Sequence, residues 1–262
     1  MNTPAVAKPV RKAVIPAAGM GTRWKPLSKY IPKELLPVSQ YPIIHYTLDE
    51  AVNSGCDECF IIYNESKSVL REYVEEEWQG MNPGIKINWL IQDKQEGVGD
   101  ATLLAIEHIH NEPLAWLYPD IYHDPVRGGL NYLMNFYNKK PAAWSGLYLK
   151  RLSEKHTPFT GKPLEDRSGL PEGNIFQLDG YDRFERNYAG FGCGRAILPD
   201  VEYIKKYDKK DLPRINGEIN DSVFFEFLWD EGVYGVELPF PVIDCGSPRN
   251  FQYIKPENII ND

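Results

Sequence analysis

Several classes of protein are excluded by what this chain lacks. Its 262 residues contain no apolar run of about eighteen residues, the length that a membrane-spanning helix needs. The first residues, MNTPAVAKPVRK, lack the apolar core of a signal peptide, so we expect a cytoplasmic protein. The net charge of -8 argues against nucleic acid as a partner, because binding DNA or RNA requires a broad basic surface. A small anionic ligand is still possible, since local charge governs a binding site.

Cysteine is also scarce. Of the four cysteines, Cys56 and Cys59 form a single C-x-x-C, and no second pair or histidine cluster follows it. Structural zinc sites usually need four such ligands. We therefore expect free thiols, with neither a zinc site nor a disulfide.

The most informative segment is residues 13–38, AVIPAAGMGTRWKPLSKYIPKELLPV. A short apolar run ends in a turn that contains Gly19 and Gly21, and the exposed N–H groups of such a turn can cradle phosphate oxygens. Prolines interrupt the residues that follow and argue against a helix there. Four cations also follow within eleven positions: Arg23, Lys25, Lys29 and Lys33. This combination predicts a polyphosphate-binding loop.

The segment closely resembles the signature of the sugar-1-phosphate nucleotidylyltransferases, G-x-G-T-R-x-x-P-x-[ST]-x-x-x-P-K-E-x-L-P. Within that family it is most similar to the bacterial UTP–glucose-1-phosphate uridylyltransferases. The resemblance implies that Arg23 holds the β- and γ-phosphates of a nucleotide and that Lys33 lies near the α-phosphate under attack. It also implies a set of nucleotide-binding residues in the loop: Ala17, Ala18, Gly19, Gly21 and Thr22.

Strand and helix signals alternate along the chain. The apolar runs predict strands over residues 12–17, 59–63, 85–91, 114–118, 174–178 and 192–198. Helical spacing of apolar residues predicts helices over 43–55, 70–78, 101–109 and 221–229. The order favours an α/β fold with a Rossmann-like, mixed but mostly parallel sheet flanked by helices, as in the nucleotide-diphospho-sugar transferases. In such a sheet, ligands bind at the carboxyl ends of the strands.

We interpret residues 1–262 as one nucleotidyltransferase domain. Residues 12–125 form its nucleotide-binding half and residues 126–262 its sugar-phosphate-binding half. The stretch 151–173 mixes proline, glycine and charged residues without a clear period, which indicates an irregular insertion.

Two aspartates follow apolar runs, Asp120 in LYPD and Asp244 in VIDCGSP. Either one alone would commonly be a turn cap. Two carboxylates at strand ends, beside a phosphate loop, favour a shared Mg²⁺, which takes one or two protein carboxylates and completes its shell with phosphate and water. Both fall on positions where the family carries metal-binding aspartates. Ile121 departs from the family, whose uridylyltransferases usually have a second aspartate there.

Base recognition is assigned to Gln92 and Gly97. A carboxamide offers a donor and an acceptor, which matches the paired edge of a pyrimidine. The segment resembles the family's Q-x-x-x-x-G-[LV]-G-x-A, with Asp100 where histidine is common. UTP is favoured, but dTTP and CTP stay open, since one methyl group changes binding by only about 1–3 kcal/mol.

The sugar-phosphate side is less clearly marked, because the family's usual E-K-P tripeptide is absent. We assign Gly194, Glu218 and Arg183 to it; Arg183 equally suits a solvent-facing hairpin, and Glu218 equally suits a helix cap.

The expected reaction is Mg²⁺-dependent, in-line transfer of a nucleotidyl group from an NTP to a sugar 1-phosphate, glucose 1-phosphate being favoured. A different phosphate acceptor, or a nucleotide-binding homologue without turnover, stays an alternative. The resemblance also allows a homo-oligomer, a dimer or a tetramer.

Overall fold

The structure is a computed structural model that describes residues 7–123, 128–140, 144–148, 159–163, 175–181, 191–220, 224, 232–238, 240 and 242–251. Among these residues, no helix combines the length and the apolar composition required to cross a membrane.

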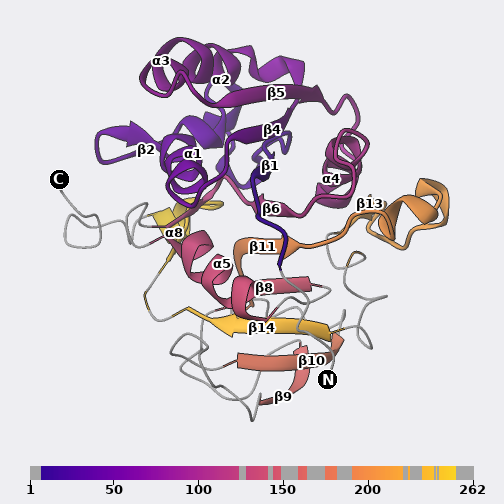
Figure 1. The fold of residues 1–262 in the computed structure, drawn as a ribbon. Helices are drawn as coiled ribbons and strands as arrows, with labels where there is room; N and C mark the ends of the chain where they lie inside the picture. Colours follow the sequence, from indigo (N-terminus) through magenta and orange to yellow (C-terminus); the bar gives the residue numbers. More distant parts are fainter. Residues whose placement is uncertain are drawn as a thin grey trace.

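A nine-stranded sheet organises the described part of the chain (Figure 1). Its order is β5-β4-β1-β6-β11-β8-β14-β10-β9. The strands have these bounds: β1 Lys12–Pro16, β4 Glu58–Tyr63, β5 Lys86–Ile91, β6 Leu114–Leu117, β8 Trp144–Tyr148, β9 Phe159–Pro163, β10 Ile175–Tyr181, β11 Phe191–Leu198 and β14 Val233–Glu237.

The sheet is mixed and mostly parallel, as predicted. β5, β4, β1 and β6 are mutually parallel, and β8 and β14 form a further parallel pair. β11 is antiparallel to both β6 and β8, and β10 is antiparallel to both β14 and β9. Within this nine-stranded sheet, β11 and β10 therefore run against the other seven strands. The six strands that the sequence predicted are all present, with ends shifted by a few residues.

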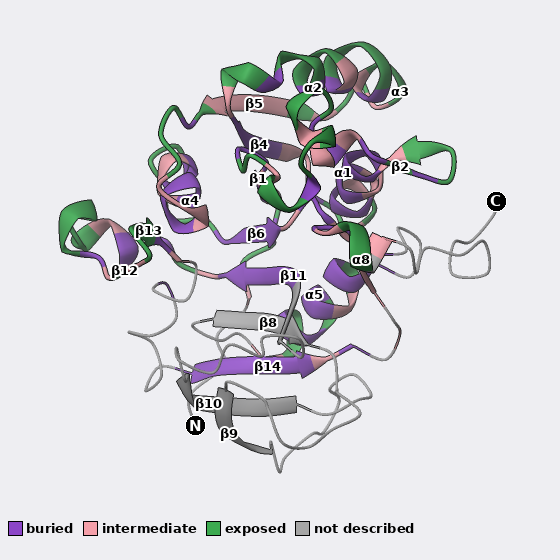
Figure 2. Cartoon of the chain, turned by 180° about the vertical axis from the view of Figure 1, so that it is seen from behind, coloured by how far each residue is buried: buried purple, intermediate pink, exposed green. Residues whose placement is uncertain are grey.

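Helices cover both faces. The helices have these bounds: α1 Ile43–Asn53, α2 Ser68–Tyr73, α3 Gln79–Met81, α4 Val98–Ile106, α5 Gly129–Lys139 and α8 Pro248–Phe251. Alternate residues of β1 point to opposite faces, because side chains alternate along a strand. Ala13 and Ile15 belong to one core with α1, α2 and α5, and Val14 belongs to a second core with α4. Figure 2 shows these inward surfaces as buried.

The helix predicted over 70–78 is interrupted. α2 passes into a π-helical turn over Val74–Trp78, and α3 follows it. Leu70, Val74 and Trp78 are nonetheless fully buried, so the apolar spacing identified the inward face correctly. Of the helix predicted over 221–229, only residue 224 is described.

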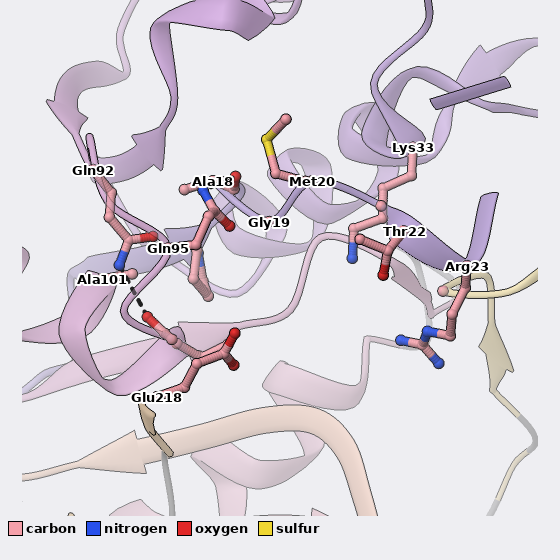
Figure 3. A pocket seen from close by; sticks show the side chains of 15 residues that line it. Ala18, Gly19, Met20, Thr22, Arg23, Lys33, Gln92, Gln95, Ala101 and Glu218 are labelled. Atoms are coloured by element: carbon pink, nitrogen blue, oxygen red, sulfur yellow. Dashed lines mark hydrogen bonds between the residues drawn. The ribbon is translucent and has the colours of Figure 1, made fainter. Parts of the chain in front are cut away.

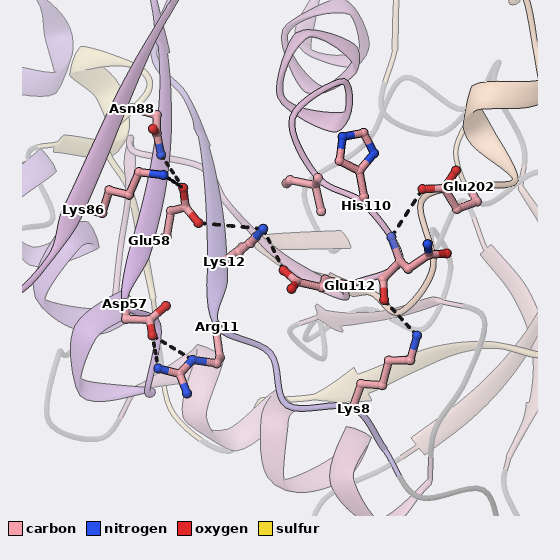
Figure 4. Close-up of polar contacts among 12 residues, drawn as sticks. Lys8, Arg11, Lys12, Asp57, Glu58, Lys86, Asn88, His110, Glu112 and Glu202 are labelled. Atoms are coloured by element: carbon pink, nitrogen blue, oxygen red, sulfur yellow. Dashed lines mark hydrogen bonds and ion pairs between the residues drawn. The ribbon is translucent and has the colours of Figure 1, made fainter.

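Charges near the amino-terminal ends of β1, β4 and β5 neutralise one another (Figure 4). Lys12 lies 3.7 Å from Glu58 and 2.7 Å from Glu112, and Lys86 lies 2.7 Å from Glu58. Arg11 pairs with Asp57 nearby. These ion pairs tie adjacent segments together at the edge opposite the one where a ligand is expected.

A buried ion pair fixes the glycine-containing turn after β1. The ammonium group of Lys67 donates to both carboxylate oxygens of Glu34, at 3.0 and 2.9 Å, and Glu34 is fully buried. The same ammonium donates to the carbonyls of Ala17 and Gly19, at 2.7 and 2.6 Å. Burial lowers the pKa of Lys67 below its ordinary value. Lys67 thus joins the two ends of the loop through one group.

A second buried pair fixes the chain after β6. The guanidinium of Arg195 donates to Glu50 at 2.9 and 2.6 Å, and also to the carbonyls of Tyr118 and Ile121, at 3.0 and 3.1 Å. Glu50 in turn accepts a 2.7 Å bond from the backbone N–H of Leu130. Burial alone would raise the pKa of Glu50, but the charge of Arg195 outweighs it and the pKa lies below the ordinary value. One ion pair therefore joins α1, β11, α5 and the loop that carries Asp120.

Replacing Arg195 with methionine should leave Glu50 buried without its cation. We expect the free energy of unfolding to fall by about 3–5 kcal/mol, the usual cost of removing one partner of a buried pair. Urea unfolding measures this loss. The matched control is Arg11→Met, which breaks an exposed pair and should leave the midpoint nearly unchanged. Equal midpoints for the two variants would contradict this role of Arg195.

Candidate active site

A cavity of about 360 Å³ opens at the carboxyl-terminal side of the parallel strands (Figure 3). Its walls come from the turn after β1, from the segment that joins β5 to α4, and from single residues far along the chain. The lining residues are Pro16, Ala18, Gly19, Met20, Gly21, Thr22, Arg23, Lys33, Gln92, Gln95, Gly97, Val98, Ala101, Glu218 and Gly246.

The turn after β1 has a conformation that requires glycine. Gly21 has φ +59°, a left-handed angle, and immediately precedes a 3-10 turn over Thr22–Trp24. The indole of Trp24 is nearly buried; it donates to the carbonyl of Cys245 at 3.0 Å and packs edge-on against Phe251, with the ring centroids 5.2 Å apart. Trp24 thereby anchors the turn, and with it Arg23, against the segment that contains Gly246.

Two of the four predicted cations line the cavity, Arg23 and Lys33, whereas Lys25 and Lys29 are exposed and do not. Nζ of Lys33 donates to Oδ2 of Asp120 at 2.5 Å. Burial acts to lower the pKa of Lys33, but the charges of Asp120 and Glu34 outweigh it and raise the pKa. Burial likewise acts to raise the pKa of Asp120, but Lys33 and Arg23 bring it below the ordinary value. The cavity wall therefore holds both groups in their charged forms.

The two predicted metal aspartates are brought together. β7 (Ile121–Tyr122) pairs antiparallel with β15 (Ile243–Asp244), and the N–H of Cys245 donates to the carbonyl of Asp120 at 2.7 Å. A Cβ placed on Gly246 would lie 2.9 Å from Oδ2 of Asp120, 2.9 Å from Oδ1 of Asp244 and 3.1 Å from Nη2 of Arg23. The two carboxylate oxygens are therefore no farther apart than twice 2.9 Å.

This arrangement fits a hard divalent cation that takes most of its ligands from a substrate. The described residues include no group of three or more histidine, cysteine or acidic side chains that could hold a metal without such help. Mg²⁺ commonly uses one or two carboxylates together with phosphate oxygens and water. The glycine at position 246 leaves open the space that both carboxylates and Arg23 face.

The opposite end of the cavity is polar but carries no cation among its lining residues. Figure 3 shows Gln92, Gln95 and Glu218 there, away from Arg23 and Lys33. The carboxamide nitrogen of Gln92 donates to the carbonyl of Gly97 at 3.0 Å and to Oδ2 of Asp100 at 2.7 Å. The side chain of Gln92 is thus fixed by the first residues of α4.

Gly97 is required by the protein's own backbone. It has φ +97°, and a Cβ there would lie 2.5 Å from the carbonyl oxygen of Ile219 and 2.9 Å from Cβ of Glu218. Both of these residues belong to β13 (Glu218–Ile219), which pairs with β12 (Arg214–Ile215). The sequence assigned Gly97 to base recognition, and the structure adds that a side chain at this position is excluded by β13. The same contact brings Glu218 to the cavity.

The structure thus gathers most of the predicted site residues around one cavity, and it shows where the others lie except for Arg183. Ala17 is buried, and its carbonyl accepts from Lys67. Gly194 has φ +63° and packs beneath the loop that leads to Asp120; a Cβ there would lie 2.8 Å from both Tyr118 and Ile121. Arg183 lies outside the described residues, as does most of the 151–173 insertion. The homo-oligomer stays a prediction.

Several residues at the site were not identified from the sequence. Gln95 lines the cavity and donates to the carbonyl of Ala18 at 3.2 Å. Lys67 lies behind the glycine turn, and Lys209 pairs with both Glu96 and Asp100. No local pattern marks the two lysines, because their partners are distant in sequence. Gln95 carried a weak signal, since it lies between Gln92 and Gly97.

Comparison with known proteins agrees with this geometry. The family model "Nucleotidyl transferase" matches residues 12–159. A UTP–glucose-1-phosphate uridylyltransferase of Bacillus subtilis is 31% identical over 192 residues, covering 66% of this chain and 64% of that protein. One from Staphylococcus saprophyticus is 30% identical over 272 aligned residues, covering 92% of this chain and 90% of that protein. The chain thus spans less than two thirds of the length of the first of these relatives.

A solved structure shares the fold. The crystal structure of a UDP-glucose pyrophosphorylase complexed with UDP-glucose superposes with a TM-score of 0.75 at 22% identity, covering 94% of this chain and 97% of that one. This likeness concerns the fold, and the family follows from the match over residues 12–159, more than half of the chain. The chain belongs to the nucleotidyl transferase family.

Proposed function

We propose that this protein transfers a nucleotidyl group from an NTP, with UTP favoured, to a sugar 1-phosphate, with glucose 1-phosphate favoured, and releases pyrophosphate. The observation that carries the proposal is the polarity of the cavity. Its two lining cations, Arg23 and Lys33, lie at the end where Asp120 and Asp244 converge. Its carboxamides, Gln92 and Gln95, lie at the other end (Figure 3). The names of the related enzymes support the choice of UTP and glucose 1-phosphate.

This polarity sets the direction in which a nucleotide would bind. The triphosphate would lie along the glycine turn beside Arg23 and Lys33, since guanidinium and ammonium groups bind phosphate oxygens strongly. The base would lie between Gln92 and the turn that contains Ala18. Glu218 lines the base end of the cavity, and its carboxylate can accept hydrogen bonds from ligand hydroxyl groups.

A magnesium ion would be held by Asp120 and Asp244. When bound, it would neutralise phosphate charge between the two anionic substrates. Lys33 already contacts Oδ2 of Asp120, so the ammonium and the ion would compete for that oxygen. The site would therefore bring three positive groups to the substrates: Lys33, Arg23 and the magnesium ion held by the two aspartates.

The reaction itself needs no general base. The phosphate oxygen of the acceptor is already anionic near neutral pH and attacks the α-phosphorus of the NTP. The bond from that phosphorus to the bridging oxygen breaks, and pyrophosphate leaves. The task of the site is to hold two polyanions in line and to offset their charge. In this proposal Lys33 would stabilise the charge that develops on the α-phosphate, and Arg23 would hold the leaving pyrophosphate.

Pyrophosphate release from UTP and glucose 1-phosphate in the presence of Mg²⁺ tests the proposal.

Lys33→Met should lower turnover about a hundred- to a thousandfold, the usual effect of removing one preorganised charge from a site of this kind. Lys86→Met is the matched control: it also breaks a lysine–carboxylate pair, of 2.7 Å, but at the amino-terminal edge, and should leave turnover unchanged. A Lys33→Met effect below about threefold would argue against the role. Absence of pyrophosphate release by the wild-type protein, with several NTPs and sugar 1-phosphates, would refute the function.

Gly246→Ala tests the acidic pair without removing a charge. The added methyl group would lie 2.9 Å from each aspartate oxygen and 3.1 Å from Arg23, so it must displace at least one of them. We expect a large loss of Mg²⁺-dependent turnover and a higher Mg²⁺ concentration at half-maximal rate. Gly80→Ala is the control, since a Cβ there meets nothing within 4 Å. Wild-type Mg²⁺ dependence in Gly246→Ala would show that the metal does not lie between these aspartates.

A further inference from the structure

Asp100 occupies a position that the proposed reaction does not use. Its side chain is buried at the start of α4, and Asp100 is not among the residues that line the cavity. One carboxylate oxygen, Oδ2, accepts the 2.7 Å bond from Gln92, and the other, Oδ1, pairs with the ammonium of Lys209. A buried charge of this kind needs a partner, and Lys209 supplies it from a segment more than a hundred residues away.

The neighbours of Gln92 determine which way its carboxamide faces. The carbonyl of Gly97 and the carboxylate of Asp100 are both acceptors, so only the NH₂ group of Gln92 can satisfy both. Turning the carboxamide over would place its oxygen against two other oxygens, which is unfavourable. Figure 3 shows the nitrogen on the hydrogen-bonded side and the oxygen directed toward Ala18 and Gln95.

We propose that Asp100 is a positioning residue that sets the base specificity of this site. By fixing the NH₂ group of Gln92, it leaves a hydrogen-bond acceptor facing the cavity. Uracil and thymine present an N–H donor at N3, which such an acceptor can bind. Cytosine presents a lone pair at N3, so two acceptors would face each other. The inference rests on the proposed function, since it requires a nucleotide base at this end of the cavity.

Lys209 makes this arrangement depend on the second half of the chain. It pairs with Glu96 as well as with Asp100, and therefore spans the two sides of Gly97. The side chain of Lys209 is 44% exposed, whereas that of Asp100 is 5% exposed. Lys209 takes Oδ1 of the carboxylate and so leaves Oδ2 for Gln92. An asparagine at position 100 would direct its amide oxygen to Lys209 and its NH₂ group to Gln92, which would oppose the present orientation.

The test is the affinity of the full chain for three nucleotides, measured by calorimetry with UTP, dTTP and CTP. For the wild-type protein we expect UTP to bind at least about tenfold more tightly than CTP, the scale of one hydrogen bond replaced by a repulsive contact. In Asp100→Asn we expect that ratio to fall about tenfold, with UTP and dTTP weakened to the same degree because both carry the N3 donor. A residue that only supported the fold would weaken all three nucleotides alike, and thermal unfolding of each variant measures that effect separately.

Lys209→Met gives a second test, in which the substituted side chain is partly exposed and the buried residues stay unchanged. It removes the partner of Asp100 from a partly exposed position, and we expect the UTP-to-CTP ratio to fall in the same direction. Lys210→Met is the matched control, because Lys210 is 76% exposed and pairs with Asp208 away from the cavity. An unchanged UTP-to-CTP affinity ratio in Asp100→Asn would overturn the inference and leave the proposed function intact. If Asp100→Asn does not fold, an unchanged ratio in Lys209→Met has the same meaning. A wild-type protein that bound none of the three nucleotides would overturn both.

Discussion

Buried carboxylates must pair with cations, and these ion pairs hold the segments at the carboxyl-terminal edge of this sheet in place. Glu34 and Glu50 are fully buried and Asp120 is nearly so, and each has a lysine or an arginine within 3 Å. Because an isolated buried charge costs several kcal/mol, each pair fixes the position of the chain segments that carry it. Lys67 holds the glycine turn, Arg195 holds the loop that leads to Asp120, and Lys33 joins these two pieces through its bond to Asp120. The geometry of the site thus follows from charge pairing as much as from the glycine signature.

The same pairing bears on how an acidic protein could bind the two anionic substrates of the proposed reaction. Lys33 pairs with Asp120 at 2.5 Å, so a ligand phosphate would compete with that carboxylate for the ammonium group. Among the described cavity-lining cations, Arg23 is the one without a carboxylate at ion-pair distance. Nη2 of Arg23 lies instead beside the space at Gly246 that Asp120 and Asp244 also face. Local arrangement, rather than the net charge of -8, therefore decides which ligand the site attracts.

Much of the site could be predicted because its chemistry is local in the sequence. Gly21, Arg23 and Lys33 stand within one signature, Asp120 follows the end of β6 by three residues, and Asp244 is the last residue of β15. The pairing of Lys33 with Asp120 was not predicted, since it joins positions 87 residues apart. Lys67 and Lys209 were not predicted for the same reason: a lysine in a polar stretch is indistinguishable from a surface residue until its distant partner is known. The contact of Gly97 with β13 was not predicted, because no sequence pattern shows that β13 packs against it.

The segment 209–219 links the two halves of the predicted domain at the base end of the cavity. The N–H of Ile219 donates to the carbonyl of Glu96 at 2.8 Å, Glu218 lines the cavity, and Lys209 pairs with Asp100. A side chain at Gly97 or Gly99 would collide with this segment: a Cβ at Gly97 would meet β13, and one at Gly99 would meet β13 and Asn220. A shift of this segment would therefore move Glu218 and loosen the support of Gln92 together. Glu218, from the second half of the chain, is thus mechanically coupled to the residues of the first half that orient Gln92, the proposed base-binding residue.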